Sequence, residues 1–205
     1  MRSEDAKAKL LVEFPELGNP EIIFQKEVFA HFGLAFLKFG LVEHSLINVL
    51  TFWSVGEGVR TGKIRSRLTW ESAFDSGYEQ AVALTFGNLT KKVCSIAEFS
   101  DLRSSFADAK RLRDYFAHHF MRDEAAYFES EEGCWLLLTK IAEVRHQVLR
   151  LEDALKPRFE AMRERLKLPR QDESQLNELL AAYYREARED IAAGSAKVGW
   201  EKNAL

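Results

Sequence analysis

The sequence predicts an all-α fold, an antiparallel helical bundle of about five helices with a long fourth helix and a C-terminal helix. The 205 residues include only 4 prolines and 11 glycines, so long helices meet few interruptions. Strand signals are almost absent, because the chain lacks sustained apolar–polar alternation and has no Asn-Gly or Asp-Gly turn between apolar runs. Hydrophobic residues make up 46% and charged residues 30%, which is typical of a folded globular protein.

The first helix is expected to begin at Asn19-Pro20-Glu21, which supplies an N-cap, an N1 proline and a first-turn acid, and to run to about Trp53. It is apolar on most faces, which predicts a central element covered on several sides. The segment 54–67, SVGEGVRTGKIRSR, follows. Its glycines predict a loop.

A second helical region is expected over about 70–98, with an interruption near Gly87. A third helix should begin after Ser100-Asp101 and continue to about Phe128.

The fourth helix should follow Ser130 and carry an apolar seam with spacings of four and three residues. The seam consists of Leu137, Ile141, Val144, Val148, Leu151, Leu155, Phe159, Met162 and Leu166. Pro157 lies within it and predicts a kink or a break. Asp172 and Gln175 resemble a capping box at the start of a last helix, 173–193.

The length predicts a single domain over residues 1–193, with a core over about 20–155, a helical extension over 156–193 and a flexible tail over 194–205. The charged N-terminus MRSEDAKAK does not fit a signal peptide, and the apolar stretch 28–53 carries ionisable residues that disfavour a membrane span. The two cysteines are widely spaced and are expected to be reduced thiols. We therefore expect a cytoplasmic protein without membrane contact.

The net charge of −3 gives no global signal for nucleic-acid binding, so any anion site must be local. The segment 54–67 is locally basic through Arg60, Lys63, Arg65 and Arg67. One interpretation is a solvated connector, and the other is a mobile arm that gathers a polyanion.

The most informative stretch is RLRDYFAHHF, residues 111–120. On a helix Asp114 and His118 are neighbours, so the carboxylate can orient one imidazole nitrogen and leave the other free as a general base. Arg113 is suited to grip a phosphate but lies about 140° around an ideal helix from His118. The two can converge through the long arginine side chain, a bend or a symmetric partner chain. From the residues alone, a solvated surface ion pair remains the alternative.

Residues 113–118, RDYFAH, match the pattern of the HEPN superfamily: arginine, a polar residue and a histidine after a short intervening stretch. The continuation to Arg122 resembles the "RNxxAHxFFR" stretch of one bacterial branch. FGLAFLKFGLVEHSLINVL, residues 32–50, resembles that branch's first long helix, in which a glutamate near the middle corresponds to Glu43. TFGNLTKKV, residues 85–93, resembles its turn between helices.

The resemblance implies an all-α homodimer in which the motifs of both chains face one cleft. Many members are metal-independent ribonucleases, often toxins of toxin–antitoxin or phage-defence systems, so RNA and an antitoxin protein are the implied partners. Carried onto this chain, His118 would move the proton of the ribose 2′-hydroxyl or of the leaving oxygen. Arg113 would hold the scissile phosphate, and Asp114 would orient or tune the site.

The sequence departs from the family pattern at two positions. Asp114 stands where asparagine is common, and Phe120 stands where some relatives carry a tyrosine that an antitoxin modifies. The expected RNA-binding residues around the motif and in the basic loop are His119, Lys110, Arg122, Arg60, Lys63 and Arg65.

A different class of function also fits the sequence: a non-catalytic α-helical dimeric module that binds a protein partner or nucleic acid. The near-continuous apolar first helix and the long seam support it. No cofactor is expected. A metal site is disfavoured, because adjacent histidines on a helix point about 100° apart.

Overall fold

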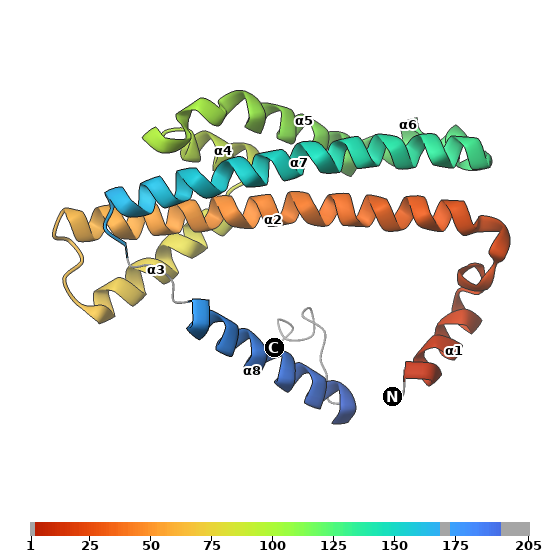
Figure 1. Cartoon of the computed structure of the whole chain (residues 1–205), viewed down its shortest axis with the longest axis horizontal. Helices are drawn as coiled ribbons and strands as arrows, with labels where there is room; N and C mark the ends of the chain where they lie inside the picture. Colours follow the sequence, from red (N-terminus) through yellow and green to blue (C-terminus); the bar gives the residue numbers. More distant parts are fainter. Residues whose placement is uncertain (1–2, 169–172, 194–205) are drawn as a thin grey trace. The chain divides into compact units, whose positions relative to one another are not determined.

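The computed structural model describes residues 3–168 and 173–193. Within these ranges the chain forms helices and connecting turns and no β-strand, so the predicted all-α class is confirmed (Figure 1). Contacts divide the chain into two compact units, residues 22–168 and residues 1–21 with 169–205. The described residues form eight α-helices rather than about five, because two predicted helices are each divided and residues 3–13 form a further one.

The central helix α2, Ile23–Arg60, follows a 3-10 turn at Pro20–Ile22. The side chain of Asn19 accepts a hydrogen bond from the backbone N–H of Glu21 at 2.9 Å, so the predicted start signal operates one turn ahead of the α-helix.

The prediction of a loop from residue 54 is wrong, because α2 continues to Arg60. Its glycines allow close packing: a Cβ atom on Gly56 would lie 2.7 Å from Cδ1 of Leu166, and one on Gly58 would lie 2.6 Å from Cδ1 of Ile64. Only the short segment 61–66 connects α2 to the next helix.

The second helical region divides into α3, Arg67–Val82, and α4, Phe86–Val93. Ser66 and Thr85 cap their N-termini by accepting hydrogen bonds from backbone N–H groups, so the interruption lies just before Gly87. A 3-10 segment, Ala97–Leu102, leads into α5.

The third predicted helix is not continuous to Phe128. It consists of α5, Arg103–His118, the single turn α6, Phe120–Asp123, and a 3-10 segment, Ala125–Glu129. The break occurs at His119, whose φ of −124° is not helical. The resulting turn directs Glu124 back to the hydroxyl of Tyr115 on α5.

The long helix α7, Glu131–Arg165, begins after Ser130, whose hydroxyl accepts a hydrogen bond from the backbone N–H of Gly133 at 3.0 Å. Of the kink or break predicted at Pro157, the break is absent, because α7 continues through the proline. The helix carries buried seam residues on both sides of the proline, including Leu155 and Met162, and these tertiary contacts maintain it despite the lost hydrogen bond.

Helices α2 and α7 lie side by side and run in the same direction (Figure 1). The ring of Phe24 lies 5.8 Å from that of Trp135, at a tilt of 56°, at the start of both helices, and Leu166 packs on Gly56 at their ends. The antiparallel prediction is therefore wrong for this pair, because α3 to α6 return the chain to the level where α2 began. Helix α5 runs in the opposite direction: Phe116, near its end, stacks on Phe32 of α2 at 5.3 Å.

By length and composition, the segment Pro20–Arg60 is the one helix of the described residues that could cross a membrane. Buried core helices of soluble proteins meet the same criterion, so the expected cytoplasmic location stays a prediction.

In the other unit, the described residues form α1, Ser3–Glu13, a 3-10 turn, Pro15–Gly18, and α8, Glu173–Ala193. The predicted bounds of the last helix are confirmed. Its expected cap at Asp172 and the expected tail over 194–205 lie outside the described residues.

Candidate functional site

Arg113 lies on the side of α5 that faces α2. Its guanidinium Nη2 is 3.6 Å from Oε2 of Glu43, and both side chains are about 30% exposed, at 30% and 27%. The guanidinium also lies over the ring of Phe86 on α4, 5.6 Å from the centroid. Three helices therefore position this arginine, and it contacts the glutamate that the family resemblance had singled out.

Asp114 has a different partner from the one expected. Its carboxylate accepts a hydrogen bond from Nζ of Lys110, one turn earlier on α5, and lies 4.0 Å from Nη1 of Arg113. Asp114 and His118 do share one face of α5, but the expected hydrogen bond between them is not formed in the described structure. Any role of Asp114 in orienting His118 requires a new hydrogen bond from the imidazole to this carboxylate, which can accept more than one.

The two histidines end α5 and point in different directions. His118 is exposed, and its ring makes an edge contact with that of His119, 6.4 Å between centroids. Nδ1 of His119 is 2.8 Å from Nη2 of Arg122 and 4.0 Å from Oδ2 of Asp123. His119 is thus held by neighbours, whereas the ring of His118 is accessible to a substrate.

An open hollow of about 540 Å³ lies along α5 beside this cluster. Its lining residues are Ala107, Lys110, Arg111, Asp114, Tyr115 and His119. Three of the predicted site residues, Lys110, Asp114 and His119, therefore lie on one concave surface, which Arg113 and His118 do not line. Arg111 also lines it, with its guanidinium paired to Asp108 at 3.0 Å.

A buried polar cluster supports one wall of this hollow. Glu124 is 8% exposed, accepts a hydrogen bond from the hydroxyl of Tyr115, and accepts two from Nζ of Lys140 at 2.9 and 3.2 Å. Burial, and then the contact with Glu124, raise the pKa of Tyr115. Burial acts to raise the pKa of Glu124 as well, but the hydrogen bonds from Tyr115 and Lys140 outweigh it and lower the pKa.

No local sequence pattern indicates this cluster, because Glu124 follows Arg122-Asp123 in a stretch that resembles a solvated surface. Tyr115 stacks against His119, with ring planes 15° apart and centroids 6.5 Å apart. The cluster therefore fixes a ring that borders the candidate site.

The basic loop is separate from the hollow. Arg60 pairs with Glu57 at 2.7 Å, and Nε of Arg65 donates to the carbonyl of Gly62 at 2.6 Å. Lys63 is exposed. Arg60 is seventeen residues beyond Glu43 on the same helix, which corresponds to about 25 Å. The predicted RNA-binding residues therefore form two groups within one chain.

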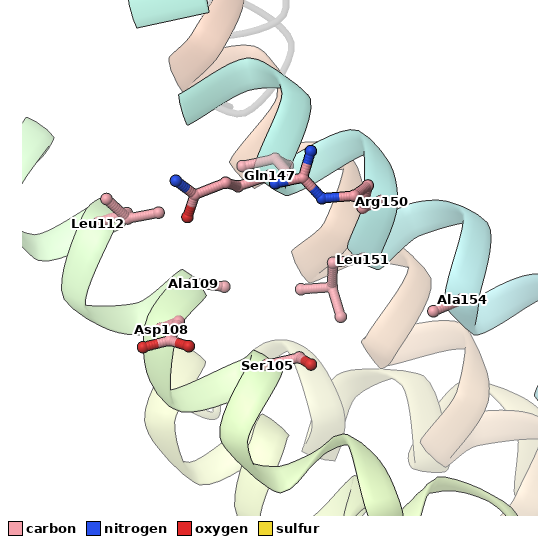
Figure 2. Close-up of a pocket in the computed structure, with 9 residues that line it drawn as sticks. Ser105, Asp108, Ala109, Leu112, Gln147, Arg150, Leu151 and Ala154 are labelled. Carbon is pink, nitrogen blue, oxygen red and sulfur yellow. The ribbon is translucent and has the colours of Figure 1, made fainter. Parts of the chain in front are cut away.

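A second concavity, of about 320 Å³, lies between α5 and α7 (Figure 2). Figure 2 shows Ser105 and Asp108 on the α5 side, and Gln147 and Arg150 on the α7 side. None of the predicted site residues lines it.

Within the described residues, no three His, Cys, Asp or Glu side chains gather as metal ligands. Comparison with known proteins yields no matching family model, no matching curated protein and no matching solved structure.

Proposed function

We propose that this protein is a metal-independent endoribonuclease of the HEPN type that acts as a homodimer, with Arg113 and His118 at its active site. The observation that carries the proposal is the contact between Arg113 and Glu43, since the family resemblance singles out both positions on separate helices. The exposed side chain of His118 and the hollow along the same helix, which Lys110, Arg111 and His119 line, add support.

In the proposed reaction, His118 removes the proton of a ribose 2′-hydroxyl, and the 2′-oxygen attacks the adjacent phosphorus. The bond from phosphorus to the 5′-oxygen breaks, and this oxygen takes up a proton from a second acid, for which the partner's His118 is the candidate. The products are a 2′,3′-cyclic phosphate and a 5′-hydroxyl end.

Arg113 would hold the phosphate and stabilise its developing negative charge with two parallel hydrogen bonds. Its 3.6 Å ion pair with Glu43 is partly exposed, so a phosphate can compete for the guanidinium. The flanking side chains of Lys110, His119 and Arg122 would extend the anion surface along the RNA backbone. Asp114, next to the arginine, opposes phosphate binding when Lys110 does not neutralise it.

The test is cleavage of single-stranded RNA by the purified protein in EDTA. Arg113→Ala and His118→Ala should abolish cleavage, and Arg113→Lys should restore only part of it because lysine cannot form the two-bond grip. Lys91→Ala removes an exposed lysine of α4 and is the matched control. Equal cleavage by the wild type and both alanine variants would refute the assignment.

A role as a toxin of a toxin–antitoxin or phage-defence system belongs to the same proposal. Expression of the wild type should then arrest growth, and expression of His118→Ala should not. Growth arrest by both proteins would rule out cleavage as its cause.

The second candidate is a non-catalytic helical module that binds a protein partner or nucleic acid. The observation in its favour is the pairing of Asp114 with Lys110, which leaves His118 without the expected orienting carboxylate. RNA that stays intact with the wild type under all conditions, together with a stable co-purifying protein, would favour this candidate.

A further inference from the structure

Within the unit of residues 22–168, the N-terminal half of α2 presents an apolar face that no other element of this unit covers, here called the α2 outer face. It consists of Phe29, Ala30, Gly33, Leu34, Phe36, Leu37, Gly40, Leu41 and His44. Its large side chains are 43–57% exposed, with Leu37 the most exposed at 57%. A contiguous apolar patch of this kind is often functional and indicates an interaction site.

The same side of the helix is covered further along. Ile47, Thr51 and Val55 continue the outer face at spacings of three and four residues, and all three are buried. Helix α3 covers them: a Cβ atom on its Gly77 would lie 3.8 Å from Cγ2 of Thr51. This side of α2 therefore already packs against one helix. The part of α2 that α3 covers ends near His44, whose ring lies 6.4 Å from that of Tyr78 on α3.

The outer face is complementary to itself. A Cβ atom on Gly33 or Gly40 would meet nothing within 4 Å, so each glycine leaves a gap in the apolar surface. Suppose that two α2 helices pack antiparallel about a two-fold axis at Leu37. A residue a given number of positions before Leu37 then faces the residue of the second copy that lies the same number of positions after it. Gly33 then lies opposite Leu41 of the second copy, and Leu34 opposite its Gly40. Each leucine fills a gap that a glycine leaves.

The area also fits a second copy of the chain. Two phenylalanines and three leucines, each about half-exposed, present on the order of 400 Å² of apolar surface. At the roughly 65% apolar content of homodimer interfaces, this corresponds to about 1,200 Å² buried in total, the lower limit of a stable interface. Such an interface predicts a dimer that dissociates on dilution.

We infer that the α2 outer face binds the same face of a second copy, antiparallel and in register at Leu37. A lipid surface fits less well, because interfacial helices carry lysine and arginine along their polar flanks. The one lysine beside the central part of this face, Lys38, pairs with Glu152 of α7.

This arrangement has a consequence for the candidate site, which rests on the proposed function. Glu43 lies about 60° around α2 from Gly40, so the Arg113–Glu43 pair borders the outer face. A two-fold axis perpendicular to the plane of the two α2 helices would place both copies of α5 on one side of that plane. The two His118 residues would then flank one cleft. The molar mass in solution and the register of disulfide cross-linking test the dimer independently of RNA cleavage.

The first test is the molar mass of the full chain by sedimentation equilibrium over a wide concentration range. The wild type should shift from 23.6 kDa to twice that mass as its concentration rises. Leu37→Glu places two carboxylates against each other at the axis and should raise the Kd about a hundredfold or more. Leu68→Glu, at a 76% exposed leucine of α3, should leave the Kd unchanged.

The second test fixes the register. Leu37→Cys should form an intermolecular disulfide under mild oxidation, since the two copies of residue 37 meet at the axis. Ala30→Cys should not, because its two copies would lie about 21 Å apart along the helices. Both native cysteines are buried, so they do not compete.

A wild type that stays monomeric at all concentrations would overturn the inference, as would an unchanged Kd in Leu37→Glu. Flotation of this monomer with phosphatidylserine vesicles would assign the face to lipid instead. Equal cross-linking of both cysteine variants would overturn the register.

Discussion

The polar cluster of Tyr115, Lys140 and the buried Glu124 allows a quantitative prediction for a double-mutant cycle. Tyr115→Phe removes one hydrogen bond to a carboxylate that keeps Lys140 at 2.9 Å, so the free energy of unfolding should fall by only about 1 kcal/mol. Glu124→Leu has a similar volume but leaves the partly buried Tyr115 hydroxyl without its acceptor. This change should lower the free energy of unfolding by about 2.5 kcal/mol.

The double variant should lose about 2 kcal/mol, less than the sum of its parts, because the hydroxyl that Glu124→Leu leaves unpaired is absent in Tyr115→Phe. The expected coupling energy is therefore about 1.5 kcal/mol. The assay is urea unfolding followed by circular dichroism, with the slope m compared between variants.

Lys140→Met is the control. The lysine side chain is 42% exposed, so its loss should lower the free energy of unfolding by less than about 1 kcal/mol and show little coupling to Tyr115. Additivity of Tyr115→Phe and Glu124→Leu within about 0.5 kcal/mol would refute the proposed hydrogen-bonded cluster.

Three further predictions concern the fold. Gly133→Ala should lower the free energy of unfolding by about 2–3 kcal/mol, because the new Cβ atom would clash with the backbone carbonyl oxygen of Tyr127 and lie 2.9 Å from its Cα. Gly77→Ala, with ordinary contacts, should raise it by about 0.5–1 kcal/mol. Equal urea midpoints for these two variants would contradict the packing. Arg60 and Arg165 lower the pKa of Glu57, and Arg165 lowers that of Glu98 against the effect of burial. Because both folded-state pKa values are depressed, their stabilisation is present above the unfolded pKa of about 4.3 and is lost as the pH falls through the folded values. Stability measured by urea unfolding should therefore decline in acid less steeply in Arg165→Gln than in the wild type, and parallel acid limbs would contradict this. Burial raises the pKa of the Cys94 and Cys134 thiols, so a thiol reagent should label the native protein slowly and the unfolded protein rapidly. Rapid labelling of the native protein would show that these side chains are accessible.

The sequence predicts elements well where the signals are local. Ser130 and the seam from Leu137 specify α7, and the last helix has the expected bounds. The errors arise where a distant segment decides the outcome. The glycines at 56 and 58 led to the prediction of a loop, because their role in helix packing is not visible in the local sequence. Leu166, against which Gly56 packs, is more than a hundred residues away. The turn after the break at His119 places Glu124 against Tyr115 and against Lys140 of α7, a contact that local sequence does not show.

The candidate site shows the same division between local and distant information. The Arg113–Glu43 contact joins two helices, and only the family resemblance suggested that both positions matter. The pairing of Asp114 with Lys110 was accessible from the sequence, since the two residues are four apart on one helix. Predicting that the basic loop lies apart from the hollow requires the true length of α2. No local signal in the sequence indicates that this helix continues to Arg60.

The most direct test of the proposed activity is the chemistry of the RNA ends produced in EDTA. The proposed reaction predicts 2′,3′-cyclic phosphate and 5′-hydroxyl ends, and no cleavage of an RNA whose 2′-hydroxyls are all replaced by hydrogen. Loss of these products in Arg113→Ala and His118→Ala would agree with the roles of both residues. Cleavage of the 2′-deoxy substrate, or undiminished products from either variant, would contradict them.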